Sequence, residues 1–155
     1  MWPEEYPLLE TFLYEAIFQR DPANRLPRDV IYRPELYIYI EDFGHRPDDR
    51  CLCAEQDGRV TGAVWTRIIP AYGHIDDDTP EFAISLLLEA RGQGVGTALM
   101  RAMLERLRRD GYARASLAVQ KDNYALRMYR KVGFRTVDEN AEEYIMICDL
   151  KEAGA

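Results

Sequence analysis

The stretch FAISLLL at residues 82–88, followed by RGQGVG at 91–96, decides the fold of this chain. Its first part is a near-continuous apolar run, which is typical of a strand covered on both faces. Beyond it, apolar side chains recur at helical spacing, at Val95, Ala98, Leu99, Ala102, Met103 and Leu107. Glycines let a backbone approach a ligand closely, and the first amides of a helix carry partial positive charge. This strand, turn and helix start therefore predict an anion-binding site.

Two common phosphate-binding turns do not fit this spacing. A nucleoside triphosphate loop ends in Gly-Lys-Ser or Gly-Lys-Thr, whereas Gly96 is followed by Thr97 with no lysine. A dinucleotide fingerprint has glycines at relative positions one, three and six, and the sixth residue counted from Gly92 is Thr97. That fingerprint also needs an acidic residue after the next strand, where this chain has Gln120 and Lys121. Both interpretations are therefore excluded.

A third pattern fits the loop. Arg91-x-x-Gly94-x-Gly96 resembles the pyrophosphate-binding signature of the GCN5-related N-acetyltransferases (GNAT), which use acetyl-CoA. Downstream, NYALRMYRKVGF at residues 123–134 resembles a second signature of this family, which runs from an Asn through Ala-x-x-x-Tyr to Gly-Phe. The two motifs stand at the right distance, with a predicted helix and strand between them. The resemblance covers residues 54–150.

The resemblance implies the fold. GNAT domains have an α/β (α+β) fold, in which about four helices flank a mixed, mostly antiparallel central sheet of about six strands that is splayed at the cofactor strand. We expect a single N-acetyltransferase domain over residues 1–155, a length that suits one domain. Asp57-Gly58 predicts a hairpin turn. The patterns predict strands at 50–55, 60–69, 82–88, 114–119, 134–137 and 143–150, and helices at 7–20, 34–42, 95–110 and 123–131.

The start of the chain departs from the family pattern. Family members commonly open with a short strand, but residues 1–5 are few and are interrupted by Pro3. Either the sheet lacks this edge strand, or a second subunit covers the edge, which would make the protein a homodimer.

The resemblance also implies where acetyl-CoA would bind. Backbone amides of the loop would hold its pyrophosphate, with the Arg91 side chain near the charge; the loop consists of Arg91, Gly92, Gln93, Gly94, Val95 and Gly96. The main chain of Leu86 and Leu88 would pair with pantetheine as a neighbouring strand would, and Asn123 would contact the pantetheine arm. Family members often have proline at the position of Leu88, which is a mild departure.

Direct acetyl transfer to an amine follows from the same resemblance. The acetyl group would lie in the gap between the splayed strands, where the Leu86 amide would polarise the thioester carbonyl. Tyr129 would protonate the departing thiolate. The structural alternative for Tyr129 is a half-buried ring that anchors a helix to the sheet.

A general base has to take the proton from the ammonium form of the acceptor. Glu81, at the start of the cofactor strand, is the candidate by position, acting directly or through water. Asp76, Asp77 and Asp78 would draw a cation toward it. Alternatively, Glu81 is a solvated strand end and the aspartates form an ordinary polar loop.

The charge of the chain is unevenly distributed. The net charge is −7, yet residues 91–131 hold ten Lys or Arg against three Asp or Glu. The acidic remainder would repel nucleic acid, so nucleic-acid binding is excluded. This remainder favours a cationic small-molecule or peptide amine as acceptor; its acids include Glu41, Asp42, Asp48, Asp49, Asp76, Asp77 and Asp78.

Metal and membrane functions find no support in the sequence. Cys51, Cys53 and Cys148 cannot form a closed set of disulfides, and we expect them to be structural. Only His45 and His74 could add metal ligands, so we expect no metal. No apolar run approaches the roughly 18 residues of a membrane span, and the first residues lack a secretory pattern. We therefore expect a soluble, cytoplasmic protein without a membrane partner.

Two other functions use the same scaffold. A domain that keeps its CoA affinity but has lost activity would serve as a sensor or interaction module, and acyl transfer to a hydroxyl needs the same geometry. The intact Arg91, Gly94, Gly96, Asn123 and Tyr129 favour an active enzyme over a binding module.

Overall fold

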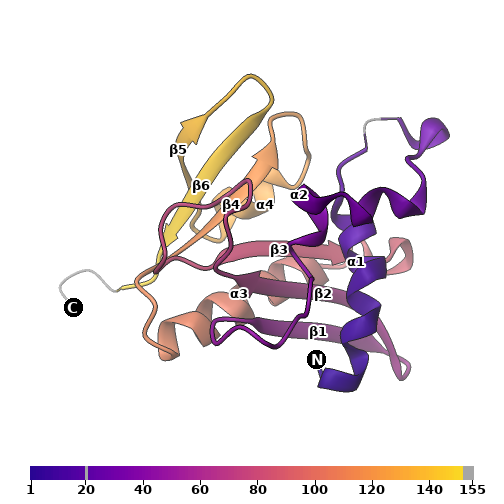
Figure 1. Ribbon diagram of the computed structural model, residues 1–155, viewed down its shortest axis with the longest axis horizontal. Coiled ribbons are helices and arrows are strands. Elements are labelled where there is room, and N and C mark those ends of the chain that lie inside the picture. The colour runs from indigo at the N-terminus through magenta and orange to yellow at the C-terminus, as the bar shows by residue number, and fades with distance from the viewer. Residues whose placement is uncertain (20, 152–155) are drawn as a thin grey trace.

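The computed structural model describes residues 1–19 and 21–151. Six strands form one sheet in the order β1-β2-β3-β4-β6-β5 (Figure 1). The strands are β1 (Arg50–Gln56), β2 (Arg59–Arg67), β3 (Glu81–Leu86), β4 (Arg114–Gln120), β5 (Arg135–Glu139) and β6 (Glu143–Asp149). The α-helices are α1 (Leu9–Ala16), α2 (Pro34–Tyr37), α3 (Val95–Arg109) and α4 (Leu126–Lys131). Short 3-10 helices are η1 (Pro3–Leu8), η2 (Pro22–Asn24), η3 (Arg28–Tyr32) and η4 (Leu88–Ala90).

The sheet is mixed and mostly antiparallel, as expected, and it opens between its two parallel strands. β3 and β4 share one register pair, Glu81 with Ser116, and the Ser116 amide donates to the Pro80 carbonyl over 2.9 Å. On its other side β4 pairs with β6 along its whole length, from Arg114 to Gln120. β3 and β4 therefore diverge after their first contact, which confirms the expected splay.

Helices cover both faces of the sheet (Figure 1). The core on one face gathers α3 with Val64 of β2, and the core on the other face gathers α1 with Ala63 and Trp65. Successive side chains of a strand point to opposite faces, so β2 contributes to both cores in turn. Its central residues are therefore fully buried.

The buried stripe of α3 is rotated from the predicted one. Ala98 and Ala102 were expected within the stripe but are exposed, and Met100 and Leu104 are buried in their place. Burying the longer side chains removes more apolar surface from water, which favours this rotation.

The first two helices are shorter than predicted. α1 begins at Leu9 after η1 and ends at Ala16, because Ile17 is already extended with φ −71° and ψ 117°. Ile17 and Phe18 leave the helix and line a cavity instead. The predicted end at Arg20 lies outside the described residues. α2 ends at Tyr37 rather than Asp42, although hydrogen-bonded turns continue to residue 43.

Strand boundaries at the site also differ from the prediction. β3 ends at Leu86, so Leu88 lies outside the strand, at the first position of η4, and is 76% exposed. At the start of the chain, by contrast, the first residues form no strand, as expected, and are followed by η1, so that β1 is the edge of the sheet. The predicted hairpin turn is confirmed, because Asp57 and Gly58 have φ values of 53° and 77°.

Candidate active site

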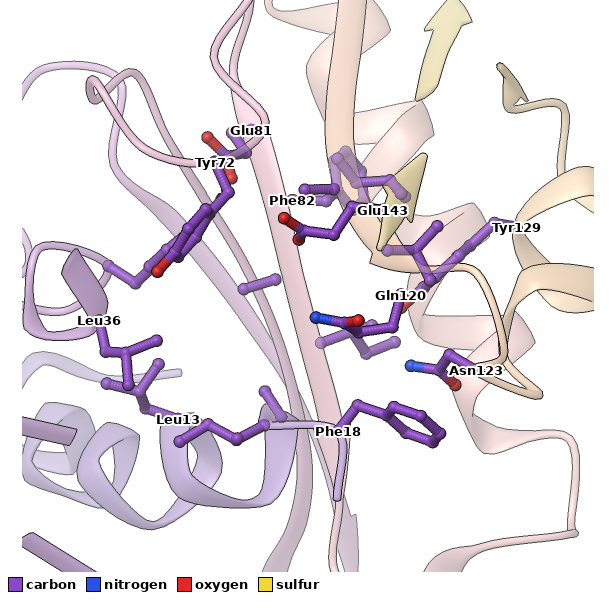
Figure 2. Close-up of a pocket in the computed structure, with 18 of the residues that line it drawn as sticks. Leu13, Phe18, Leu36, Tyr72, Glu81, Phe82, Gln120, Asn123, Tyr129 and Glu143 are labelled. Carbon is purple, nitrogen blue, oxygen red and sulfur yellow. Dashed lines mark hydrogen bonds between the residues drawn. The ribbon is translucent and has the colours of Figure 1, made fainter. Parts of the chain in front are cut away.

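The divergence of β3 and β4 opens a cavity of about 310 Å³ (Figure 2). Both predicted catalytic side chains, Glu81 and Tyr129, line it together with Asn123. Other walls come from the end of α1, from residues near α2, from the middle of both strands and from the turn before β6; they include Ile17, Phe18, Leu36, Tyr39, Tyr72, Ile84, Gln120 and Glu143. The splay thus brings the two candidates to one space.

Glu81 is a buried carboxylate with one unpartnered oxygen. The residue is 3% exposed, so it is not a solvated strand end. Its Oε2 accepts hydrogen bonds from the Tyr39 hydroxyl and from the Gly73 amide, the latter over 3.0 Å, whereas Oε1 is buried without a partner among the described residues. Burial raises the pKa of Glu81 to about 7, against the lowering effect of these two hydrogen bonds. A carboxyl group with this pKa is poised to act as a base near neutral pH.

Tyr39 is held in place by the buried strand β2. Trp65 donates from Nε1 to the Tyr39 carbonyl over 3.0 Å. Arg67 donates to the carbonyls of Ile38 at 2.9 Å and Glu41 at 2.8 Å, which lie on either side of Tyr39. The Arg67 guanidinium is itself neutralised by Asp49 in a buried, bidentate ion pair at 2.8 and 2.9 Å. The segment after α2 is therefore fixed where its tyrosine meets Glu81.

Tyr129 lies on α4 and is half-buried. Its ring packs edge-on against Phe134, with centroids 6.3 Å apart, so it does anchor α4 to the sheet. Figure 2 shows the same side chain directed from α4 toward the cavity, near Gln120 and Asn123. Burial raises the pKa of Tyr129 to about 12, and the nearby Tyr124 adds to the effect. The phenol therefore keeps its proton at neutral pH.

Asn123 stabilises the turn that precedes α4. Its Oδ1 accepts a hydrogen bond from the Ala125 amide over 2.9 Å, and α4 begins at Leu126 rather than at Asn123 as predicted. The helix does end at Lys131 as predicted, and Gly133, whose φ is 114°, follows soon after it. The Asn123 side chain thus stabilises this turn and also lines the cavity.

The glycine loop exposes backbone amides. Gly92 and Gly94 have φ values of 75° and 81°, which favour glycine, and a Cβ atom at either position would meet no atom within 4 Å. The first hydrogen bond of α3 runs from the Ala98 amide to the Gly94 carbonyl over 3.1 Å. The amides of residues 95–97 therefore precede the helical hydrogen-bond ladder and are available to an anion.

Two side chains of the loop are engaged by the protein itself. Arg91 donates from Nε to the Leu86 carbonyl over 3.1 Å and pairs with Glu15 at 3.1 Å. Its guanidinium is thereby directed toward β3 and α1, so its contact with pyrophosphate stays a prediction. Gln93 donates from Nε2 to the Glu89 carbonyl over 2.8 Å.

The inner edge of β3 faces the gap with its main chain. The Leu87 amide donates to the Thr61 carbonyl of β2 over 2.8 Å. Along a strand, the backbone groups of successive residues point to alternate sides. The N–H groups of Ile84 and Leu86 therefore face away from β2, toward the opening. Ile84 lines the cavity, which the sequence analysis did not predict, because it placed the amide beside the acetyl group at Leu86.

Apart from Glu81, the acidic residues of the cavity are not those that the sequence analysis named. Asp49 is bound by Arg67, Asp76 pairs with Arg114, and His74 lies 3.8 Å from Asp77. Three glutamates line the cavity instead, and no Lys or Arg is among the described lining residues; they are Glu81, Glu142 and Glu143. No sequence signal singles out the last two.

The described residues also bear on metal binding, membrane insertion and cysteine reactivity. Within residues 1–19 and 21–151, no three His, Cys, Asp or Glu side chains form a group that could hold a metal ion. None of the helices in these two ranges has the length and apolar character needed to cross a bilayer. The cysteines there are free, and burial raises the pKa of the Cys51 thiol to about 12, which keeps it protonated at neutral pH.

Comparison with known proteins agrees with this geometry. A family model described as the acetyltransferase (GNAT) family matches residues 12–134. The chain belongs to the GNAT family. The match extends upstream of residue 54, where the resemblance of the sequence motifs begins, and confirms the family that those motifs indicated.

The GNAT chain is similar to curated proteins named mycothiol acetyltransferase. That of Saccharomonospora viridis is 35% identical over 95 residues, which cover 59% of this chain and 31% of the relative. That of Pseudarthrobacter chlorophenolicus is 30% identical over 117 residues, which cover 75% of this chain and 36% of the relative. The chain thus spans about a third of the length of these relatives.

Solved GNAT structures share the fold over nearly the whole chain. The ribosomal-protein-S18-alanine N-acetyltransferase of Escherichia coli has a TM-score of 0.68 at 19% identity, covering 99% of this chain and 93% of its own. The PaiA N-acetyltransferase of Thermoplasma acidophilum, crystallised in complex with coenzyme A, has a TM-score of 0.69 at 19% identity, covering 94% and 93%. At 19% identity, this structural likeness establishes the fold alone.

Proposed function

We propose that this chain is an acetyl-CoA-dependent N-acetyltransferase that moves an acetyl group directly to a primary amine. The observation that carries the proposal is the divergence of β3 from β4. Beyond Glu81, it leaves the β4-facing edge of β3 without a paired strand, next to a cavity lined by Glu81 and Tyr129. The glycine loop, which exposes its amides, follows the same strand after η4.

The residues present fit acetyl-CoA. The amides of residues 95–97, with open space at Gly92 and Gly94, suit the pyrophosphate. The outward N–H group of Leu86 suits pantetheine, which would add to the sheet edge. Leu88 and Asn123 would border the same arm. When bound, acetyl-CoA supplies a thioester, an activated donor of the acetyl group.

Three groups of the chain would support the transfer. Glu81 would take a proton from the incoming ammonium through Oε1, which has no hydrogen-bond partner among the described residues. The Ile84 amide lines the cavity and would stabilise negative charge on the acetyl oxygen, a role that we assigned to Leu86 from the sequence. Tyr129 would return a proton to the sulfur, since its phenol stays protonated at neutral pH.

Release of free CoA thiol in the presence of an amine panel tests the proposal. Purified protein is mixed with acetyl-CoA and with mono-, di- and polyamines, amino sugars, lysyl peptides and amine-bearing precursors of mycothiol, the last because of the relatives' names. We expect amine-dependent thiol release and an acetylated amine by mass spectrometry. Binding of CoA without stimulation by any amine would favour a sensor module. Esters as the products would favour O-acyl transfer.

A further inference from the structure

The cavity presents only negative charge to an acceptor. Its charged residues, within the described part of the chain, are Glu81, Glu142 and Glu143. The Oε1 atom of Glu81 is buried and has no hydrogen-bond partner there. A buried carboxylate oxygen without a partner is costly, so a positively charged donor that enters the cavity would be stabilised.

Glu143 provides a second, separate acidic position. It is the first residue of β6, is half-buried and takes part in none of the ion pairs among the described residues. Figure 2 shows its carboxylate pointing across the gap toward Tyr72 and Glu81. Burial raises the pKa of Glu143, and the charge of Glu143 in turn contributes to the raised pKa of Glu81. Both carboxylates therefore act on the same space.

The wall on the α1 and α2 side is apolar and aromatic. It carries Leu13, Ile17, Phe18 and Leu36, with the half-exposed ring of Tyr72 at its edge. Apart from the Tyr72 hydroxyl, these side chains are apolar and suit a chain of methylene groups. A volume of about 310 Å³ is at the lower end of small-molecule sites and fits a slender ligand.

We infer that the acceptor is a linear alkyl diamine or polyamine, with one amino group presented to Glu81 and a second, distant ammonium group bound by Glu143. This inference rests on the proposed acetyl transfer. The first nitrogen forms a bond to the acetyl carbon as the carbon–sulfur bond breaks. Glu81 takes one proton from the ammonium form before the attack, and the nitrogen loses a second proton to water after it. The CoA sulfur receives a proton from Tyr129, which regains one from water. The second ammonium group stays unmodified and sets the position of the first.

Three acceptors with the same five-carbon chain test the second charge: 1,5-diaminopentane, 5-amino-1-pentanol and pentylamine. For the wild type we expect kcat/KM with the diamine to exceed that with pentylamine by about ten-fold or more, the size of one charge-assisted contact. Glu143→Gln should remove most of this preference, because it should raise KM for the diamine much more than KM for pentylamine. Glu55→Gln, the same charge change on the exposed far edge of the sheet, should retain it. Equal use of the three acceptors, or an equal loss with all three in Glu143→Gln, would overturn the inference.

Calorimetry separates this inference from the proposed function. We expect 1,5-diaminopentane to bind the wild type and the Glu55→Gln variant, and to bind Glu143→Gln about ten-fold more weakly. Diamine binding of this kind without any thiol release would support the acceptor site and contradict the acetyl transfer. Acetyl transfer without a diamine preference would support the proposed function and contradict the acceptor site. Absence of both diamine binding and diamine preference would refute the inference.

Discussion

The Tyr39 hydroxyl donates a hydrogen bond to Oε2 of Glu81, across 42 residues of sequence. This contact joins the segment after α2 to the first residue of β3. Together with the Gly73 amide it occupies one carboxylate oxygen and leaves the other buried without a hydrogen-bond partner among the described residues. The pair therefore sets both the orientation of Glu81 and its affinity for a proton.

Tyr39→Phe should shift the pH dependence of acetyl transfer. If Glu81 acts as the base, kcat/KM of the wild type rises with pH and levels off above the pKa of about 7. The hydrogen bond from Tyr39 lowers that pKa, so its loss should move the acidic limb to higher pH, by up to about one unit. Tyr37→Phe, the same loss of a hydroxyl two residues earlier, serves as the control. An unmoved limb in Tyr39→Phe would remove the tyrosine from the control of the base.

Glu81→Gln should stabilise the fold while it lowers activity. The pKa of Glu81 rises from 4.5 to about 7 on folding, so between these pH values the folded state binds more protons than the unfolded state. Stability of the wild type therefore falls as pH increases through this window, by on the order of 3 kcal/mol. Glutamine accepts the same two hydrogen bonds but does not titrate.

Urea denaturation at pH 4.5 and pH 8 measures this effect. We expect the variant to be more stable than the wild type by about 1–3 kcal/mol at pH 8 and nearly equal to it at pH 4.5. A constant difference at both values would mean that Glu81 does not titrate in this range, and its assignment as a base would then be wrong.

Tyr129→Phe should reduce turnover and spare cofactor affinity. Phenylalanine keeps the edge-on contact with Phe134, so α4 should stay in place. Loss of an acid catalyst predicts a fall in kcat of about ten-fold or more. Calorimetry should give an unchanged dissociation constant for acetyl-CoA. Tyr124→Phe, at an exposed neighbouring ring, should behave as the wild type; unchanged turnover in Tyr129→Phe would leave this residue a purely structural role.

Thr97→Pro tests the anion site at the start of α3. Proline in the first helical turn removes one N–H group that the helix does not use, so the fold should be retained. We expect affinity for CoA to fall about ten-fold relative to Thr97→Ala, which loses the same side chain but keeps the amide. Substitution of Gly94 would be a poorer test, because its φ of 81° strains any side chain. Equal affinities of the two Thr97 variants would exclude this amide from the site.

The elements that surround the glycine loop could be predicted from the sequence because their signals are local. The apolar run of β3, the helical spacing of α3 and the turn at Asp57 are properties of neighbouring residues. Even there, the prediction of which α3 side chains are buried was wrong, because their burial depends on the strands beneath the helix. The ends of α1 and α2 were wrong for a similar reason, because tertiary contacts hold Ile17 and Tyr39 outside the helices.

By itself, the sequence determined the family, the loop that exposes its amides and the two candidate catalytic side chains, because motif spacing encodes the order and backbone conformation of successive residues. Only the tertiary structure decided the environment of those side chains. The proximity of Tyr39, Glu143 and Glu81 depends on strand order and on the angle at which β3 leaves β4. Burial and long-range hydrogen bonds, which no local pattern contains, then set the pKa of Glu81 and the charge of the cavity.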